Sequence, residues 1–382
     1  MNINKFSFED KSREWKLETV AFNRLTLLVG ASGVGKTQIL RAINRLTGIA
    51  EGNSMNGICW DVDFTTSDKN IYSWKGEFEK KDVNPFFDDE DEDNDKNKPK
   101  IIFEEITLNG KPLASRREEK ILFEGKETIK LAKEKSLVNL LIEEDPINIV
   151  NKEVKRIRMN DHSDSQKEPF RINLFDSTKL AKKYNTLQKI QESDLDIGIK
   201  IYLVYKNDKK TFSKIKERFV DIFPQIEDIK IAPVDLKDEA APPFLKDHPF
   251  IQIKEKGVDK WVEQGRISSG MFRSLFHISE LYLSPEGTIF LIDEFENSLG
   301  INCIDELTND IINSKRDLQF ILTSHHPYII NNINFNNWKL VTRNAGVVKT
   351  HDAIEFNLGK SKHDAFMQLI QLEEYQTGSE AL

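Results

Sequence analysis

The chain has 382 residues and a formal net charge of −8, so it is long enough to bury a sizeable core and could hold two domains. The negative balance argues against a protein coated in nucleic acid, and no window of about 18 apolar residues indicates a membrane span. The first residues predict a strand and lack the apolar core of a signal peptide. Two cysteines, Cys59 and Cys303, have no metal-like spacing, which favours a reducing, cytoplasmic location without a structural disulfide.

A phosphate-binding loop lies near the N-terminus, between a predicted strand and a predicted helix. Residues 30–37 match the pattern G-x-x-x-x-G-K-[ST] at every fixed position. The apolar run 25–29 precedes the loop as a strand, and apolar residues at helical spacing follow it until Gly48, a predicted C-cap. The glycines would let backbone N–H groups point at a triphosphate, while Lys36 adds a positive charge and Thr37 offers a hydroxyl to Mg²⁺.

These features predict a nucleoside triphosphate site, and a chance glycine-rich turn is the alternative. The residues expected to bind the nucleotide are Gly30, Ser32, Gly33, Val34, Gly35, Lys36, Thr37 and Gln38.

Residues 51–135 are rich in aromatic and alternating segments, which predict antiparallel strands. The strands expected here are residues 60–64, 101–106 and 121–123, with a hairpin turn at Asn109-Gly110. An acidic loop, 82–100, interrupts this region with a run of like charges from Asp88 to Asp95 that cannot be buried. We expect that loop to be disordered; the alternative is an acidic segment that attracts a basic partner.

Residues 136–259 mix helical and strand patterns. The predicted helices are 136–144, ended by Pro146, and 209–223; the predicted strands are 199–204 and 229–232. Two basic clusters occur, one of Lys152, Lys155, Arg156 and Arg158 and one of Lys209, Lys210, Lys214, Lys216 and Arg218. Such clusters are usually solvated surface, and contact with nucleic acid or a partner protein is the alternative.

The second half of the chain carries three further segments whose polar residues could belong to a nucleotide site. A predicted helix begins at Ser268, Ser269 and Gly270 and continues with apolar spacing through Leu281. The apolar strand 289–292 ends in Asp293 and Glu294, and the apolar strand 320–323 leads to His325. Beside a phosphate loop, the first acid would hold Mg²⁺ through water and the second would orient or deprotonate the attacking water. For the acidic pair, an ordinary exit from a strand into a loop is the alternative.

The order of these motifs resembles ABC-type ATPases, and more narrowly the soluble branch that contains RecF, SMC and OLD-family proteins and the ATPase subunits of several anti-phage systems. The matching motifs are Ser268-Ser-Gly270, Asp293-Glu-Phe-Glu296-Asn-Ser-Leu299 and Thr323-Ser-His325-His-Pro327. They cover both ends of the chain and leave residues 51–260 loosely explained. The resemblance implies an α/β fold: a P-loop NTPase with an ABC-type ATPase head, made of a parallel-sheet core and an antiparallel β-lobe, with an inserted α/β and helical region.

This resemblance divides the chain into four expected parts. They are a split ATPase core (1–50 and 260–355), a β-rich lobe beside the nucleotide (51–135, with the acidic loop 82–100), a mixed insertion (136–259) and a C-terminal helical tail (356–382), whose helix is expected at 364–375.

In the resembled family, two chains close head-to-tail around ATP and Mg²⁺. Ser268, Ser269 and Gly270 would then contact the γ-phosphate held by the other chain. The resemblance implies three catalytic residues, Glu294, His325 and Lys36, with His326 as the less favoured histidine. It implies Thr37 and Asp293 as the ligands of Mg²⁺. Asn297 and Ser298 correspond to the loop that follows the acidic strand in this family. A strand-end histidine bonded to the backbone is the alternative for His325.

The chain departs from the family pattern at three places. No glutamine occurs between residues 39 and 165, where relatives carry one that touches the metal. Glu104 or Glu105 could substitute, although charged strand residues usually face solvent. Phe295 stands where many relatives have proline, and Gly300 where OLD-like relatives often have histidine. These departures leave the hydrolysis rate open.

The implied function is an ATP-hydrolysing switch that forms a homodimer or a higher oligomer. Full-length OLD-type proteins carry a nuclease domain after the ATPase, and the roughly 30 residues after the Asn344-Ala-Gly346 turn leave no room for one. We therefore expect a separately encoded effector, a nuclease in anti-phage defence as in Septu-like and PARIS-like systems. The alternatives are a RecF-like DNA clamp, a scaffold that binds ATP without turnover, and a transporter subunit, which the missing glutamine and the long insertion disfavour.

Overall fold

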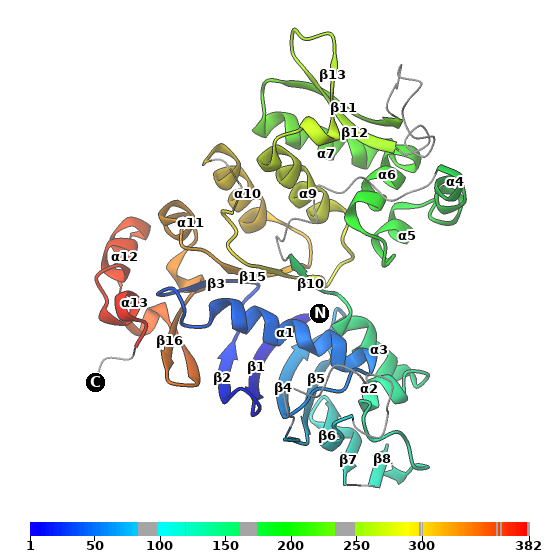
Figure 1. Cartoon of the computed structure of the whole chain (residues 1–382), viewed down its shortest axis with the longest axis vertical. Helices are drawn as coiled ribbons and strands as arrows, with labels where there is room; N and C mark the ends of the chain where they lie inside the picture. The colour runs from blue at the N-terminus through cyan, green and yellow to red at the C-terminus, as the bar shows by residue number, and fades with distance from the viewer. Residues whose placement is uncertain are drawn as a thin grey trace. The chain divides into compact units, whose positions relative to one another are not determined.

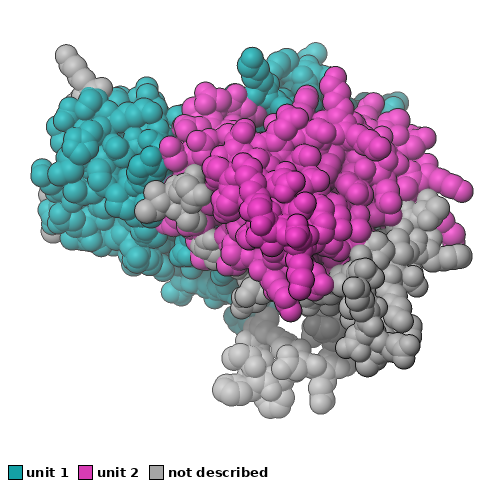
Figure 2. Space-filling view, turned by 90° about the horizontal axis from the view of Figure 1, so that it is seen from above, with its two compact units in different colours: residues 1–161, 286–295, 315–382 teal, residues 162–285, 296–314 magenta. Residues whose placement is uncertain are grey.

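The computed structural model divides into two compact units. Unit 1 comprises residues 1–161, 286–295 and 315–382, and unit 2 comprises residues 162–285 and 296–314 (Figure 1, Figure 2). The structure describes residues 1–82, 98–118, 120–160, 174–233, 249–297, 299, 301–356, 358–359 and 361–379. The predicted acidic run from Asp88 to Asp95 lies outside the described residues, as does Ser298.

Unit 1 is built on a mixed sheet of 14 strands within the described residues. Its parallel core consists, in order across the sheet, of β10 (Ile157–Asn160), β14 (Ile289–Ile292), β15 (Gln319–Thr323), β3 (Leu25–Val29) and β16 (Trp338–Asn344). The sheet continues through β17 (Val347–Asp352), β2 (Trp15–Ala21) and β1 (Asn2–Asp10). It ends in an antiparallel lobe of β4 (Ile58–Thr65), β5 (Ile71–Phe78), β6 (Ile101–Leu108), β7 (Lys111–Arg117), β8 (Lys120–Phe123) and β9 (Lys126–Glu127).

The central strands of the parallel core are mostly apolar, as is typical of parallel strands covered on both faces. Every residue of β14 and β15 is buried. The strands predicted at 25–29, 289–292 and 320–323 are therefore confirmed. Because these strands are parallel, their carboxyl ends meet at one edge of the sheet, which brings the residues that follow them together.

The antiparallel lobe has an aromatic core. The rings of Trp60 and Trp74 meet edge to face with centroids 5.5 Å apart, and Phe78 lies equally close to Trp60. Gly76 makes room for this packing, since a Cβ there would lie 2.4 Å from the Trp60 ring. The predicted strands 60–64, 101–106 and 121–123 lie within β4, β6 and β8, and Asn109-Gly110 forms the predicted turn between β6 and β7.

The helices of unit 1 are α1 (Lys36–Glu51), α2 (Leu137–Leu140), α3 (Asp145–Val154), α11 (Pro327–Asn332), α12 (Lys362–Leu369) and α13 (Glu373–Thr377), with 3₁₀ turns η4 (Phe335–Asn337) and η5 (Ala353–Phe356). Helix α1 packs against β10, β14 and β15 and against α2 and α3 (Figure 1).

Three predicted helix limits are wrong. Helix α1 passes Gly48 and ends at Gly52, whose φ of 95° is the left-handed conformation of a C-cap. Pro146 does not end a helix; it lies in the first turn of α3, where its missing N–H costs nothing. The single helix predicted at 364–375 is two helices, α12 and α13.

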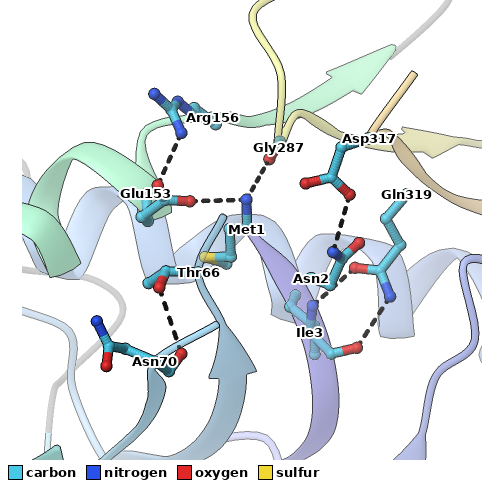
Figure 3. A network of polar contacts seen from close by, with 10 residues as sticks. All are labelled: Met1, Asn2, Ile3, Thr66, Asn70, Glu153, Arg156, Gly287, Asp317 and Gln319. Carbon is cyan, nitrogen blue, oxygen red and sulfur yellow. Dashed lines mark hydrogen bonds and ion pairs between the residues drawn. The ribbon is translucent and has the colours of Figure 1, made fainter. Parts of the chain in front are cut away.

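Polar contacts hold the first residues of the chain against the amino ends of β14 and β15 (Figure 3). The Met1 amino group lies 2.7 Å from a Glu153 carboxylate oxygen and donates to the Gly287 carbonyl at 2.9 Å. The Gln319 side chain accepts from the Ile3 N–H at 2.7 Å and donates to the Ile3 carbonyl at 2.9 Å. These contacts fix one end of the parallel core and leave the carboxyl edge for other loops.

Unit 2 contains a three-stranded antiparallel sheet and several helices among its described residues. The strands are β11 (Ile226–Pro233), β12 (Pro249–Glu255) and β13 (Trp261–Glu263). The helices are α4 (Leu174–Lys183), α5 (Leu187–Gln191), α6 (Ile197–Asn207), α7 (Lys209–Ile222), α9 (Ser269–Leu283) and α10 (Ile301–Asn313), with a 3₁₀ turn η3 (Gln264–Arg266).

The predicted helix 209–223 and strand 229–232 are confirmed, whereas the strand predicted at 199–204 is wrong. That segment lies in α6, which packs against α5, α7 and α9. A helix covered on several sides has no polar stripe, so its short apolar run cannot be told from a buried strand.

The predicted basic face of α7 is partly neutralised. Arg218 pairs with Glu306 at 2.6 Å and with Asp310 at 2.7 Å, and Lys216 pairs with Asp228 at 3.0 Å. In the other cluster, Arg156 pairs with Glu153 at 2.7 Å. None of the helices in the described ranges has the length and apolar character needed to cross a bilayer.

Candidate nucleotide-binding site

A pocket of about 280 Å³ opens at the carboxyl edge of the parallel core in unit 1. It is lined by Ser32, Gly33, Gly35, Lys36, Thr37, Gln38, Asp293, Glu294, Thr323, His325 and Arg343. These residues follow or end β3, β14, β15 and β16, so the parallel pairing of four strands brings them together.

The phosphate loop between β3 and α1 depends on its glycines. Gly30 has a φ of 141°, and a Cβ there would lie 2.6 Å from the Val341 carbonyl oxygen of β16. Gly35 has a φ of 107° and is the N-cap of α1, with no side chain capping the helix. The first N–H groups of α1 therefore have no side-chain acceptor at the cap, and together with the helix dipole they form a site for an anion.

The Lys36 side chain is buried within this loop. Its ammonium donates to the Gly30 carbonyl at 2.9 Å and to the Ala31 carbonyl at 2.8 Å. Both acceptors belong to the loop itself, so the positive charge is held where a phosphate would enter. Gly30 and Val34, also predicted to bind nucleotide, shape the loop and are not part of the pocket lining.

Thr323 holds the acidic end of β14 in place. Its hydroxyl donates to Asp293 Oδ1 at 2.6 Å and accepts from the Glu294 N–H at 2.8 Å, while its carbonyl accepts from the Phe295 N–H at 3.1 Å. The Phe295 side chain is buried and anchors the turn. A bulky apolar residue therefore fits at this position.

The backbone of Glu294 has a φ of 46°, a left-handed conformation that is uncommon for a residue other than glycine. It costs about 1–2 kcal/mol and persists only where neighbours impose it. Here the contacts from Thr323 impose it, and the result is an exposed Glu294 side chain on the pocket wall.

The two adjacent histidines have different surroundings. His325 lines the pocket. His326 is the N-cap of α11, and its Nδ1 accepts from the Tyr328 N–H at 3.2 Å. Capping gives His326 a structural role, in line with its place as the less favoured of the pair.

Two residues of the pocket, Thr323 and Arg343, are not among the site residues predicted from the sequence. Thr323 belongs to the Thr-x-His-x-Pro motif, so the sequence does carry a signal for it. Arg343 lies near the end of β16, just before a hairpin turn, and only the pairing of β16 beside β3 brings it to the phosphate loop.

The residues predicted to contact a second nucleotide lie in unit 2. Ser268 is the N-cap of α9, and its hydroxyl accepts from the Met271 N–H at 3.3 Å. Ser268 and Ser269 are exposed and Gly270 is partly exposed at this helix start. Asn297 is exposed, and its carbonyl accepts from an Arg273 Nη1 group.

Arg273 lies on α9, and burial lowers the pKa of its guanidinium to about 10. Its contact with Asn297 links α9 to the loop that follows Phe295.

Neither carboxylate suggested as a replacement for the missing glutamine lines the pocket. Glu104 is fully buried in the lobe, where it accepts from Trp74 Nε1 at 2.9 Å, Ser136 Oγ at 2.5 Å and the Leu137 N–H at 2.8 Å. Glu105, on the other face of β6, pairs with Lys75 at 3.0 Å. The expectation that such strand carboxylates face solvent is thus wrong for Glu104. Three hydrogen-bond donors in the interior of the lobe satisfy its carboxylate.

The pocket contains the donors that Mg²⁺ prefers. The Thr37 hydroxyl and the carboxylates of Asp293 and Glu294 are oxygen ligands, and Mg²⁺ is usually held by one or two carboxylates together with substrate phosphates. One oxygen of Asp293 is occupied by Thr323, which orients the other. These residues fit the ion.

The phosphate loop at the start of α1, the acidic end of β14 and the parallel core extended by an antiparallel lobe define a P-loop NTPase with an ABC-type ATPase head. The chain belongs to the family described as "AAA domain, putative AbiEii toxin, Type IV TA system", whose model matches residues 25–331. The predicted α/β fold is therefore confirmed. No curated protein matches the chain.

Solved structures of SMC heads are similar to this chain at low identity. They include an SMC head bound to the C-winged helix domain of ScpA (15% identity, 92% of this chain and 98% of that chain, TM-score 0.49). The SMC head domain from Thermotoga maritima also matches (13% identity, 92% and 99%, TM-score 0.43). A third is an Smc head with an extended coiled coil, bound to the C-terminal domain of ScpA derived from Pyrococcus furiosus (12% identity, 97% and 99%, TM-score 0.43).

Proposed function

We propose that this chain is an ATP-hydrolysing molecular switch. One observation carries the proposal: the ammonium of Lys36, the hydroxyl of Thr37, two carboxylates and His325 share one pocket beside the N-terminus of α1. This is the set of groups that phosphoryl transfer to water requires, because catalysis there consists of positioning and neutralising the phosphate charge.

In the proposed mechanism, the N–H groups of the phosphate loop and Lys36 bind the β- and γ-phosphates. Thr37 and Asp293 would hold Mg²⁺, which would neutralise phosphate charge. Glu294 orients a water and accepts its proton as the water oxygen bonds to the γ-phosphorus and ADP leaves. His325 contacts the γ-phosphate. Thr323 acts indirectly, by holding Asp293 and Glu294 in place.

We infer that two copies close head-to-tail on ATP. The support is the start of α9, where two exposed serines and a partly exposed glycine lie at a helix N-terminus, a position that favours an anion. In a dimer, Ser268, Ser269 and Gly270 of one chain would bind the γ-phosphate held by the other.

We further propose that the closed and open states control a separately encoded effector, a nuclease in anti-phage defence. The family description, which refers to a toxin of a type IV toxin–antitoxin system, supports a role in conflict between a cell and a second genetic element. Affinity capture from the native host with a hydrolysis-deficient variant tests this step. Enrichment of a nuclease or toxin supports it, whereas recovery of DNA and repair proteins alone contradicts it.

Replacing Lys36 by alanine should lower the affinity for ATP about 10- to 100-fold, because a hydrogen bond to a charged group contributes about 1.5–3 kcal/mol. Titration calorimetry with ATP and Mg²⁺ measures this. Lys111→Ala, an exposed lysine of the lobe, is the control and should bind as the unmodified chain does. Equal affinity in Lys36→Ala and the unmodified chain would refute the proposed function.

A RecF-like clamp is the second candidate, favoured by three lysines of α7 that are exposed, Lys209, Lys210 and Lys214. A clamp binds duplex DNA by itself in an ATP-dependent and salt-sensitive manner. Electrophoretic shifts with and without ATP distinguish it from a switch that needs an effector.

A further inference from the structure

The C-terminal segment of unit 1, residues 361–379, ends against the phosphate loop. Its last described turn closes at Gly378, which is buried and has a φ of 75°. A Cβ at this position would lie 2.3 Å from Val34 Cγ1 and 3.3 Å from the Ala31 Cβ. The backbone at Gly378 therefore lies so close to the phosphate loop that a side chain at this position would clash with Val34.

Gly378 also contacts β16, the strand that carries the pocket residue Arg343. Its carbonyl accepts from the Arg343 N–H at 2.7 Å, and α13 packs on β16. A third contact lies further back, where Lys362 Nζ donates to the Asn332 carbonyl at the end of α11, the helix that follows His325. The segment thus touches the phosphate loop and β16, which carry pocket residues, and the helix that follows His325.

Arg343 is the pocket residue whose backbone the C-terminal segment holds. Its side chain lines the pocket, and its Nε donates to the Ala345 carbonyl at 2.7 Å, which fixes the direction of the guanidinium. The two terminal nitrogens make no hydrogen bond or ion pair with any residue in the described part of the chain. A guanidinium held in this way presents its remaining donors as a fork suited to phosphate oxygens.

The charges of the pocket also favour a contact between Arg343 and phosphate oxygens. Asp293 and Glu294 line it, and a bound triphosphate would add several negative charges. Lys36 is bonded to loop carbonyls, so a second cation on the facing strand would balance the polyphosphate from the other side.

We propose that Arg343 is a further cationic contact for the polyphosphate of the nucleotide, and that the C-terminal segment positions it through Gly378. The segment is then part of the nucleotide site, and displacing it lowers nucleotide affinity. This inference rests on the proposed function and adds to it a residue and a route by which a partner bound at the C-terminal segment alters the nucleotide state.

The first test compares nucleotide affinities of Arg343→Ala and Arg343→Lys by displacement of a fluorescent ATP analogue. Arg343→Ala should bind ATP about tenfold more weakly, as expected for one charge-assisted contact, and should bind AMP almost unchanged. Arg343→Lys should recover part of the loss, because the charge remains while the fork is lost. Equal losses for ATP and AMP, or no loss, would overturn the assignment of Arg343.

The second test separates the close approach at Gly378 from the cost of its backbone conformation. Gly378→Ala adds a Cβ against Val34, whereas Gly125→Ala adds one at a φ of 78° with no atom within 4 Å. Both variants carry the same left-handed penalty, so only Gly378→Ala should weaken ATP binding, by about tenfold. Thermal unfolding of both variants without nucleotide checks that each is folded. If Gly378→Ala does not fold, the Arg343 variants still decide the proposal.

The outcomes also distinguish this inference from the proposed function. If neither the unmodified chain nor Lys36→Ala binds ATP, the proposed function fails. If Lys36→Ala binds ATP about 10- to 100-fold more weakly than the unmodified chain, and the Arg343 and Gly378 variants bind normally, the inference alone fails. An equal loss in Gly125→Ala also overturns the role of the C-terminal segment.

Discussion

Replacing Glu294 by glutamine is expected to leave ATP binding intact and to slow hydrolysis by about 10²- to 10⁴-fold, the usual contribution of a general base. The amide has nearly the shape of the carboxylate but cannot accept a proton from the attacking water. Glu294 is exposed, and the contacts that hold its backbone come from Thr323, so the substitution should not disturb the fold. Phosphate release under single-turnover conditions measures the rate, and calorimetry measures binding.

Glu124→Gln is the matched control for this experiment. Glu124 is also exposed and has a φ of 48°, close to the 46° of Glu294, but it lies in the turn after β8. The control should hydrolyse ATP at the unmodified rate. A rate for Glu294→Gln within twofold of the unmodified chain would mean that another group activates the water. A homodimer that accumulates in Glu294→Gln with ATP, seen by light scattering, would support closure on unhydrolysed nucleotide.

The elements of the site that could be predicted are those whose sequence signal is local. The phosphate loop is such a case, because Gly30, Gly35 and Lys36 follow one another within a few residues and a strand and a helix flank them. The acidic end of β14 is another, since a fully buried parallel strand is an uninterrupted apolar run.

The elements that could not be predicted depend on contacts between distant segments. Arg343 faces the phosphate loop only because β16 pairs beside β3, and Gly378 reaches Val34 only because α13 packs on β16. Helix α6 is buried on several sides and so lacks a helical pattern of polar residues, and its apolar run 199–204 predicts a strand instead. Pro146 lies in the first turn of α3, and the sequence alone does not distinguish a proline that begins a helix from one that follows the end of another.

Glu104 is the residue of the lobe whose loss should cost most stability. Replacing it by alanine should lower the free energy of unfolding by about 3–5 kcal/mol, the cost of removing one partner from a buried charged network. Trp74 Nε1, Ser136 Oγ and the Leu137 N–H would lose their acceptor, and the buried Arg116, which pairs across from Glu104 in register, would lose the nearest opposite charge. Urea denaturation followed by tryptophan fluorescence measures the change.

Glu105→Ala is the control, since Glu105 is the next residue on the same strand and points to the opposite face. Its pair with Lys75 is partly exposed, so its loss should cost at most about 1 kcal/mol. Similar losses for the two variants would contradict the view that the buried donors around Glu104 are the cause.

The same carboxyl group should make stability depend on pH. Burial raises the pKa of Glu104 above its ordinary value of 4.5, against the opposing effect of its hydrogen bonds and of Arg116. The folded state then holds the proton more tightly than the unfolded state, so this contribution to stability is fully present below about pH 4.5 and is lost as the pH rises through the folded pKa. Glu104→Gln cannot titrate, so the stability of the unmodified chain relative to this variant should fall over that range. Parallel pH profiles for the two proteins would mean that the pKa of Glu104 is the same in the folded and unfolded states, and that the three donors offset its burial completely.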